Sequence, residues 1–306
     1  PNSIFLEIFL KYLEYKKYKS PIILISSLKL LKFYMKKMNF KKKINLIDIK
    51  NPIVLNNSIN LVDIKFDISK NLKKFSDNSN KFISNCFNIG FNLLKKYKSN
   101  KFINGPISKE KFLKKKYPGV TEYIAKKVNV KKFAMLIYNS KLSVCPLTTH
   151  VPIKKISNKI KKKDIFNKVL LINNFYKNQR GIKPRIGVLG LNPHCESTLK
   201  FSEEDRIIRP AINSLKKAGY KISGPFSADT IFLKQNRKKF DVILGMYHDQ
   251  VLTPLKTLYE YNAINITIGL PFLRISPDHG PNTKMVGKNL SNPLSLINAI
   301  NFLDKN

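Results

Sequence analysis

The chain of 306 residues carries 57 Lys and Arg against 19 Asp and Glu, which gives it a formal net charge of +38. This length allows two domains and a large hydrophobic core. The sequence contains no run of about 18 apolar residues, so we expect no membrane span. The first residues also lack the pattern of a signal peptide, because Glu7, Lys11 and Glu14 interrupt their apolar stretch.

The positive charge is spread along the whole chain and does not gather in one segment. Short lysine runs occur at Lys41–Lys43, Lys114–Lys116, Lys161–Lys163 and Lys238–Lys239. A nucleic-acid-binding protein usually concentrates its basic residues on one face, often with aromatic residues between them. The abundance of Lys, Asn, Ile and Phe, all with A/T-rich codons, is typical of drift in an A/T-rich genome. We therefore predict no specific nucleic-acid partner, although the positive field would attract anionic substrates.

The three cysteines predict a protein without a disulfide framework. Cys86, Cys145 and Cys195 are odd in number and have no Cys-x-x-Cys spacing, which is typical of a reducing compartment and indicates the cytoplasm. Cys195 follows His194, and two interpretations stay open for it. It is either a soft metal ligand or oxidation site, or a small buried residue beside a site.

Buried strands alternate with amphipathic helices, and this alternation predicts an α/β architecture with helices on both faces of the sheet. Ser3 and Ser108 are expected N-cap residues, and Gly219 an expected C′ residue. The predicted helices are 3–16, 27–38, 77–98, 153–177, 203–218 and 291–304, with two more starting at Ser108 and after His248. The predicted strands are 21–26, 44–49, 133–138, 142–145, 185–189, 241–246 and 264–268.

The chain has only four histidines, and three of them, His150, His194 and His248, each follow a predicted strand. The ends of strands are where α/β proteins present ligands and catalytic groups. Imidazole is a common ligand of borderline metals, and three protein ligands leave positions open for substrate. Their spacing fits no local finger, so we expect the fold, or two subunits together, to assemble one divalent metal site. Taken singly, each histidine has an ordinary structural alternative.

Several polar residues near these histidines are candidates for binding anions or moving protons. Lys256, Asn265 and Arg274 flank predicted strands and suit a phosphate or carboxylate. Solvated surface charge is the alternative for Lys256. Asp249 adjoins His248 and is expected to orient it or to act in proton transfer, whereas Asp229 is either catalytic or a helix cap. No GxGxxG or GxxxxGK[ST] motif is present, so neither a Rossmann dinucleotide site nor a P-loop is predicted.

Seven segments, in the same order and spacing, resemble the 4-hydroxythreonine-4-phosphate dehydrogenases of pyridoxal phosphate biosynthesis. The resemblance runs from about residue 3 to residue 290. The segments are Asn104–Glu110, Gly119–Ala125, Leu147–Pro152, Gly190–His194, Gly224–Phe232, Met246–Gln250 and Asn265–Gly280.

The resemblance implies two α/β/α domains around a cleft, as in the isocitrate and isopropylmalate dehydrogenases, and a homodimer that shares its active site. We expect a first domain at 1–117 plus 286–306, and a second at 118–285 with most of the site and the dimer interface. By resemblance, His150, His194 and His248 bind a divalent metal, which is zinc or else magnesium, manganese or cobalt. The other implied roles are substrate binding for Thr121, Lys256, Asn265 and Arg274, catalysis for Asp249, Asp229 and Lys109, and NAD or NADP binding for His279, Gly280 and Lys284.

The sequence departs from the family pattern at four places. Val120 stands where the family has a histidine, which removes a hydrogen-bond donor worth about 1–3 kcal/mol. The loop at 195–200 has lost its glycines, and the family's opening strand is absent before Pro1, so we expect an open sheet edge or a gap. Lys284 replaces an acid that faces the ribose in related dehydrogenases, and its charge would suit a 2′-phosphate, so NADP stays open beside NAD.

The resemblance predicts oxidation and decarboxylation of 4-phosphooxy-L-threonine to 3-amino-2-oxopropyl phosphate. Two alternatives remain open at this stage. A related dehydrogenase for threonate or erythronate 4-phosphate would account for Val120 and the altered loop. A decayed, non-catalytic homologue would account for the missing start and the lost glycines.

Overall fold

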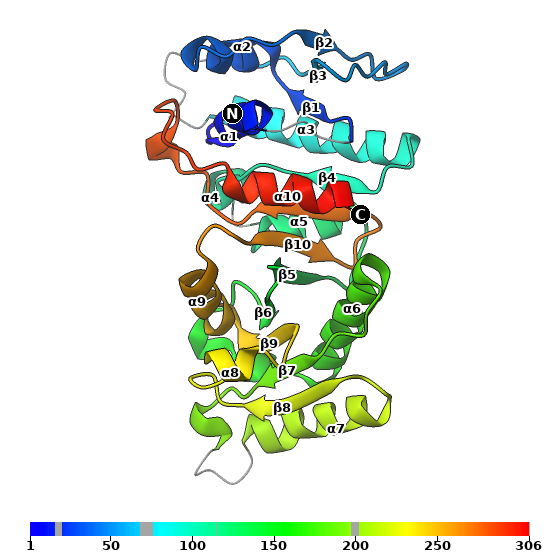
Figure 1. Ribbon diagram of the computed structural model, residues 1–306, viewed down its shortest axis with the longest axis vertical. Helices are drawn as coiled ribbons and strands as arrows, with labels where there is room; N and C mark the ends of the chain where they lie inside the picture. The colour runs from blue at the N-terminus through cyan, green and yellow to red at the C-terminus, as the bar shows by residue number, and fades with distance from the viewer. Residues whose placement is uncertain (16–19, 68–75, 115, 197–201, 306) are drawn as a thin grey trace. The chain divides into compact units, whose positions relative to one another are not determined.

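The computed structural model describes the chain except for residues 16–19, 68–75, 115, 197–201 and 306. The chain forms two compact units (Figure 1). Unit 1 consists of Pro1–Val120 and Pro271–Asn306, and unit 2 of Thr121–Leu270. The expected second domain continued to residue 285, whereas unit 2 ends at Leu270. Residues 271–285 lie in unit 1, where the strand Leu273–Pro277 pairs with Lys101–Ile103.

Unit 1 contains two groups of parallel strands packed with helices. One group is a sheet of three strands in the order β1-β3-β2, and the other is the parallel pair of β4 and β11. The elements of this unit are α1 (Phe5–Tyr15), β1 (Ile23–Ser26), α2 (Leu28–Lys37), β2 (Ile44–Leu46), β3 (Ile59–Asp63), α3 (Asp77–Lys96), β4 (Lys101–Ile103), α4 (Lys109–Leu113), β11 (Leu273–Pro277), η5 (Thr283–Met285) and α10 (Leu294–Lys305).

Unit 2 is built on six strands in the order β10-β5-β6-β9-β7-β8, in which β5 runs antiparallel to its neighbours. Helices α6 and α9 lie on opposite sides of β6 in Figure 1, and α7 packs against β8. The elements are α5 (Val120–Lys127), β5 (Ala134–Tyr138), β6 (Ser143–Thr148), η1 (Ile153–Lys155), η2 (Ser157–Lys159), α6 (Lys162–Arg180), β7 (Ile186–Leu189), η3 (Pro193–Cys195), η4 (Glu204–Ile208), α7 (Arg209–Lys217), β8 (Ile222–Phe226), α8 (Lys234–Arg237), β9 (Val242–Tyr247), α9 (His248–Tyr259) and β10 (Ile264–Ile268).

Most of the predicted elements are present. Strand β10 has the predicted bounds, and β9 is shifted by one residue. Helix α7 ends at the C-cap Ala218, and Gly219 follows with φ +81°, as expected for a C′ glycine. The end of the first helix at residue 16 lies outside the described residues. Ser108 occupies the N-cap of α4, but its side chain makes no capping hydrogen bond.

The prediction of one helix over 153–177 was wrong at its beginning. Residues 153–159 form two 3₁₀ turns, and α6 runs from Lys162 to Arg180. Ile156 and Ile160 are buried in these turns, so their helix-like spacing reflects packing of a tighter backbone. Strands β3, β4, β8 and β11 were not predicted. Gly224 and Pro225 interrupt the apolar pattern of β8, since both residues are uncommon within strands.

Strand β1 lies at one edge of the three-stranded sheet, where it pairs with β3 and with no other described strand of unit 1. A cavity of about 780 Å³ lies beside it, lined mainly by apolar side chains. Phe9 of α1, Ile25 of β1, Phe87 of α3 and Phe102 of β4 contribute to its wall. Unit 1 is therefore less tightly filled here than around the fully buried Leu10, Leu31 and Leu61.

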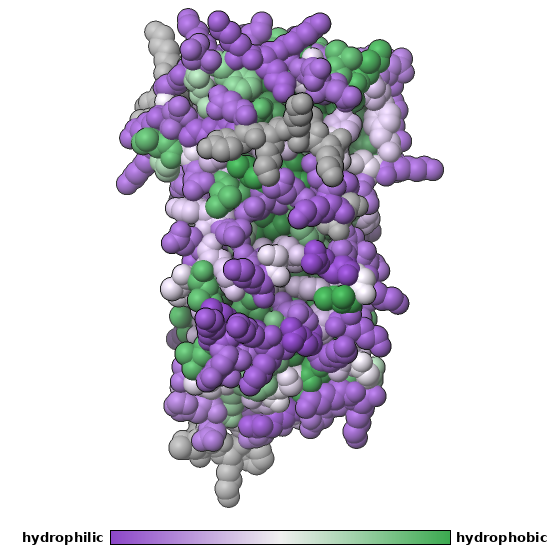
Figure 2. All heavy atoms as spheres, viewed as in Figure 1, coloured by the Kyte–Doolittle hydropathy of each residue, from purple (hydrophilic) through white to green (hydrophobic). Residues whose placement is uncertain are grey.

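The face of the molecule in Figure 2 shows hydrophilic side chains spread over both units, as the dispersed lysines predict. Among the helices that the structure describes, none is long and apolar enough to cross a membrane.

Candidate functional site

Three histidines follow three neighbouring parallel strands of unit 2. Strands β6, β9 and β7 are adjacent in the sheet and run in the same direction. His150 follows β6, His248 begins α9 directly after β9, and His194 lies in the loop after β7. Because the carboxyl ends of parallel strands meet at one edge of a sheet, all three imidazoles belong to the same edge. We call it the carboxyl edge.

The structure brings His150 and His248 side by side at this edge. Their ring centroids are 5.9 Å apart, and the side chains are 20% and 36% exposed, so both rings remain accessible to a ligand. His150 and His194 have φ values of +48° and +55°. This left-handed conformation is unfavourable for residues with a Cβ atom and often marks functional sites. The backbone at His150 and His194 therefore adopts a conformation that residues with a Cβ atom rarely adopt.

Two carboxylates lie against this pair of histidines. The Oδ1 atom of Asp249 is 2.6 Å from Nδ1 of His248, which fits the orienting role expected for Asp249. Glu122, in the first turn of α5, accepts a hydrogen bond from Thr149 Oγ1 at 3.0 Å, and its Oε1 atom lies 3.8 Å from Nδ1 of His150. Burial acts to raise the pKa of Glu122, but His150 and Thr149 outweigh it and hold that pKa below its usual range.

Asp229 lies in the exposed turn that follows β8, at the same carboxyl edge. A hydrogen bond with the Ser227 hydroxyl lowers the pKa of Asp229, and the nearby His194 imidazole contributes to the same shift. The next described helix, α8, begins at Lys234 with Leu233 as its N-cap. The alternative in which Asp229 caps a helix was therefore wrong.

The four substrate-binding candidates occupy different places. Thr121 is buried in α5, and Lys256 is exposed on α9. Asn265 lies on β10 opposite Ile137 of β5, which in turn pairs with Val144 near the start of β6. Asn265 thus lies toward the amino end of β6, roughly 20 Å along the strand from His150 at about 3.3 Å per residue. Within one chain it is remote from the histidines.

Arg274 belongs to unit 1, where it lies on β11 and is 2% exposed. Its Nε atom donates a hydrogen bond to Asn104 Oδ1 at 2.7 Å. Arg274 is therefore a buried, hydrogen-bonded cation and not solvated surface charge. The side chain of Lys109 lies outside the described part of the structure, as do residues 197–200 of the altered loop.

The loop expected to bind the cofactor also lies in unit 1. Nδ1 of His279 is 3.0 Å from the carbonyl oxygen of Gly280, whereas its buried Nε2 has no hydrogen-bond partner among the described residues. Gly280 and Lys284 are exposed. The loop therefore combines a buried ring nitrogen without a described partner and, five residues later, an exposed cation.

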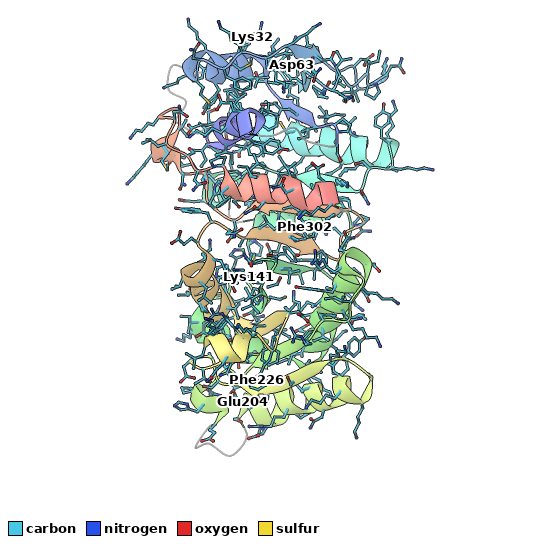
Figure 3. The ribbon with its side chains drawn as sticks, in the orientation of Figure 1. Lys32, Asp63, Lys141, Glu204, Phe226 and Phe302 are labelled. Carbon is cyan, nitrogen blue, oxygen red and sulfur yellow. The ribbon has the colours of Figure 1, made fainter. Side chains whose placement is uncertain are left out.

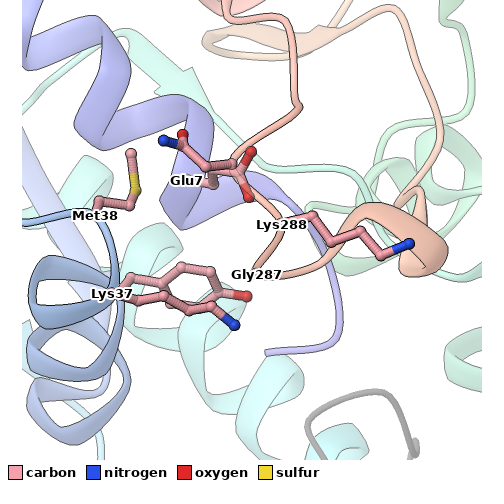
Figure 4. Close-up of a pocket in the computed structure, with 7 residues that line it drawn as sticks. Glu7, Lys37, Met38, Gly287 and Lys288 are labelled. Carbon is pink, nitrogen blue, oxygen red and sulfur yellow. The ribbon is translucent and has the colours of Figure 1, made fainter.

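A pocket of about 190 Å³ adjoins the end of this loop (Figure 4). Lys37, Gly287 and Lys288 line it together with the buried Glu7 and Tyr34. Oε1 of Glu7 accepts a hydrogen bond from the Ser291 N–H at 2.8 Å, whereas Glu7 Oε2 and the Tyr34 hydroxyl have no partner among the described residues. Burial and, secondarily, the Glu7 carboxylate raise the pKa of Tyr34 to about 12. Tyr34 therefore stays protonated near neutral pH.

The donor set at the carboxyl edge suits a divalent metal, because imidazole nitrogens with neighbouring carboxylates are the ligands and supports that such ions use. Over the described residues, no three His, Cys, Asp or Glu side chains gather closely enough to hold an ion. His150 and His248 form the part of the predicted set that one chain brings together.

Sequence reasoning missed three residues that shape this edge. They are Glu122, Glu204 and Gln250. The amide of Gln250 donates to the Gly190 carbonyl at 2.8 Å and accepts from the Met246 N–H at 2.7 Å, so it ties the loop after β7 to the end of β9. The scarcity of acids in this basic chain was an available signal for Glu122 and Glu204. No local pattern marks Gln250.

Comparison with known proteins agrees with these observations. The sequence profile of the family described as "Pyridoxal phosphate biosynthetic protein PdxA" matches residues 17–303. A 4-hydroxythreonine-4-phosphate dehydrogenase from Sulfurihydrogenibium sp. is 40% identical over 246 residues, which are 79% of this chain and 74% of that protein. A D-threonate 4-phosphate dehydrogenase from Salmonella typhimurium is 39% identical over 165 residues, which cover 54% of this chain and 50% of that protein.

A crystal structure of 4-hydroxythreonine-4-phosphate dehydrogenase from Klebsiella pneumoniae superposes with a TM-score of 0.84 at 27% identity, over 99% of this chain and 95% of that one. The expected α/β class and the isocitrate/isopropylmalate dehydrogenase-like fold are therefore confirmed. The chain belongs to the PdxA family of pyridoxal phosphate biosynthetic proteins.

Proposed function

We propose that this protein is a metal-dependent, NAD(P)-linked dehydrogenase that oxidises and decarboxylates 4-phosphooxy-L-threonine to 3-amino-2-oxopropyl phosphate. The single observation that carries the proposal is the placement of His150, His248 and His194 after three adjacent parallel strands, in a chain of this family. When bound there, a divalent ion such as zinc, or magnesium, manganese or cobalt, would acidify the substrate hydroxyl.

Other residues of the chain have roles in orienting the histidines, moving protons and binding the substrate and the cofactor. The carboxylates of Asp249 and Glu122 orient the imidazoles of His248 and His150, and Asp229 is positioned beside His194 to accept or return a proton. Thr121, Lys256, Asn265 and Arg274 hold the phosphate and carboxylate of the substrate. The loop with His279, Gly280 and Lys284 holds the nicotinamide cofactor, and the positive charge of Lys284 favours NADP.

The opposite placement of Asn265 and the histidines supports a homodimer with a shared site. One chain keeps Asn265 near the amino end of β6 and His150 at the carboxyl end. A second copy, packed against the first through unit 2, would bring its Asn265 to the histidines of the first copy. The protein would work in the cytoplasm, where its three free cysteines stay reduced.

The experiment that tests this function follows cofactor reduction by absorbance with 4-phosphooxy-L-threonine, with and without a chelator. Turnover with formation of the aminoketone phosphate, and its loss on chelation, is the expected result. Running NAD and NADP in parallel tests the role of Lys284, and a clear preference for NAD would contradict it. Metal binding at full stoichiometry without turnover on any substrate would instead favour a non-catalytic homologue.

A second candidate substrate class has an observation of its own. Val120 stands at the start of α5 beside the buried Thr121, where an imidazole would offer a hydrogen-bond donor, and one relative is a D-threonate 4-phosphate dehydrogenase. Assays with threonate and erythronate 4-phosphates separate the two readings, because only the amino-acid substrate yields an aminoketone.

A further inference from the structure

Glu204 is a fully buried acid in unit 2 that does not belong to the histidine set. Its exposure is 0%, and it begins the π-helical turn Glu204–Ile208 that leads into α7. Figure 3 labels it in the part of unit 2 that holds β8 and α7. A charged carboxylate is buried only where strong hydrogen bonds replace its water, so its partners indicate what it is for.

Among the described residues, the hydrogen-bond donors to the Glu204 carboxylate lie in two consecutive residues, Leu191 and Asn192. Oε1 accepts hydrogen bonds from the backbone N–H groups of Leu191 at 2.7 Å and Asn192 at 2.8 Å. Oε2 accepts a third from the Asn192 side-chain amide at 2.9 Å. Burial acts to raise the pKa of Glu204, but the Asn192 and Leu191 donors outweigh it and hold the pKa below its usual range. The group is therefore an ionised clamp at neutral pH.

The clamped residues stand directly before Pro193 and His194. His194 has φ +55° and ψ +12°, a conformation that a residue with a Cβ atom adopts only when its surroundings impose it. The backbone after the clamp is closed by hydrogen bonds from Cys195 N to Asn192 O and from Glu196 N to Pro193 O, both 3.2 Å. The hydrogen bonds to Glu204 thus fix the backbone at Asn192, and this anchor determines the backbone conformation of His194 two residues later.

The fit between the carboxylate and the loop is close. A Cβ atom added at Gly190 would lie 2.9 Å from Oε1 of Glu204 and 2.7 Å from Sγ of Cys195. Glycine at this position therefore lets the carboxylate reach the backbone. Cys195 is buried in the same contact, which favours the packing interpretation of this cysteine over a ligand role.

We propose that Glu204 is a positioning residue that holds the His194 imidazole where it serves as a metal ligand. This proposal rests on the proposed function, since it takes His194 to be a ligand. Glu204 acts on His194 through its hydrogen bonds with Leu191 and Asn192. Supporting groups of this kind typically change metal affinity by about 10- to 100-fold when they are removed.

The test compares the metal affinity of the full-length protein in four variants. They are Glu204→Gln, His194→Ala, the double variant and Asp241→Asn. In Glu204→Gln the side chain keeps its shape but loses its charge and turns an amide N–H₂ toward a donor. Asp241→Asn is the matched control, because Asp241 also accepts a backbone N–H, that of Arg185 at 2.7 Å, but before β9 at the opposite edge of the sheet.

The measurements are Zn²⁺ affinity by competition with a chromophoric chelator, the visible spectrum of the Co²⁺-loaded protein, and the melting temperature of the metal-free protein. We expect Glu204→Gln to weaken Zn²⁺ binding by about tenfold or more and to alter the Co²⁺ bands. In the His194→Ala background the same change should have no further effect, because a residue that acts through His194 has nothing left to position. Asp241→Asn should lower the melting temperature without changing metal affinity.

Three other outcomes would each reject the positioning role of Glu204, and the last would also reject the proposed function. Unchanged Zn²⁺ affinity in Glu204→Gln, with a large loss in His194→Ala, would reject the positioning role and leave the proposed function standing. Equal losses from Glu204→Gln with and without His194 would also reject it. Unchanged affinity in His194→Ala would remove His194 from the metal site and reject both proposals.

A milder variant decides the matter if Glu204→Gln does not fold. Asn192→Ala removes the side-chain donor to Oε2, together with the bond from the same amide to Glu203 Oε2 at 3.0 Å, and leaves both backbone bonds to the Glu204 carboxylate. We expect about threefold weaker Zn²⁺ binding, as for the loss of one of three hydrogen bonds. Wild-type affinity in this variant would contradict the proposal.

Discussion

The two edges of the sheet in unit 2 use their polar groups in opposite ways. At the amino edge, Asp241 accepts hydrogen bonds from the backbone and the guanidinium of Arg185, and the Tyr176 hydroxyl donates to Ser143 Oγ at 2.9 Å. At the carboxyl edge, His150 and His194 adopt left-handed backbone conformations and keep accessible rings. The same strands thus end in a closed polar network on one side, and on the other in strained turns that hold groups ready for a ligand.

The largest expected effect comes from removing an imidazole at the carboxyl edge. His248→Ala should weaken Zn²⁺ binding by on the order of 100-fold or more and abolish most dehydrogenase activity, because a ligand contributes more than its supporting groups. The metal-free protein should keep its melting temperature, since the ring is 36% exposed. Chelator competition and thermal melting measure both. Wild-type metal affinity would show that the two edges do not differ in the way described.

A smaller effect at the same edge is expected for Glu122→Gln. The amide oxygen still accepts from Thr149, but the negative charge beside His150 is lost. We expect about tenfold weaker Zn²⁺ binding and a matching fall in kcat. The control is Glu110→Gln, an exposed acid in the first turn of α4 in unit 1. Equal losses in both variants would mean that the loss of charge, and not the position of Glu122, is responsible.

At the amino edge the expected effect is on stability alone. Burial acts to raise the pKa of Asp241, but Arg185 holds it below its usual range. Asp241 therefore stabilises the fold above the unfolded-state pKa of about 3.9, and this contribution is lost as the pH falls through the lower folded-state pKa. Asp241→Asn should cost about 1 kcal/mol at neutral pH, since Arg185 is half exposed and solvent screens the pair.

Urea unfolding of the wild type and Asp241→Asn from pH 7 to pH 3 checks this sign. The difference between their free energies of unfolding should shrink as the solution becomes acidic. A difference that grows toward low pH would contradict it, and reduced activity in Asp241→Asn would break the contrast between the edges.

The smallest effect is expected for Thr149→Val, which removes the hydroxyl that donates to Glu122. Loss of one such hydrogen bond costs about 1 kcal/mol, so Zn²⁺ affinity should fall by about fivefold. Thr148→Val is the matched control one residue earlier, because Thr148 donates at 2.8 Å to the Met246 carbonyl within the sheet. That variant should lose stability and keep its metal affinity. The reverse pattern would contradict the assignment.

The sequence predicted the parts of this molecule that depend on local patterns. Buried runs such as 133–138 are recognisable because every residue is apolar, as expected for a strand with two covered faces. The placement of His150, His194 and His248 after strands was likewise visible. The positions of Glu122 and Glu204 were not, because an acid on a helix resembles a solvated residue until the fold brings its partners to it. The place of Asn265 could not be predicted either, because its distance from the histidines depends on the pairing of β10 with β5 and of β5 with β6.

Gln250 gives the carboxyl edge a fixed spacing. Its single amide is donor to the chain after β7 and acceptor for the end of β9, and it stands two residues after His248. An ionised carboxylate offers no donor and an aliphatic chain offers neither function, so neither Glu nor Leu at this position could make both bonds. One side chain thus adds to the pairing of β7 with β9 a direct tie between two loops that carry candidate ligands. Redesign of this protein for an ion of different radius would have to begin at that position.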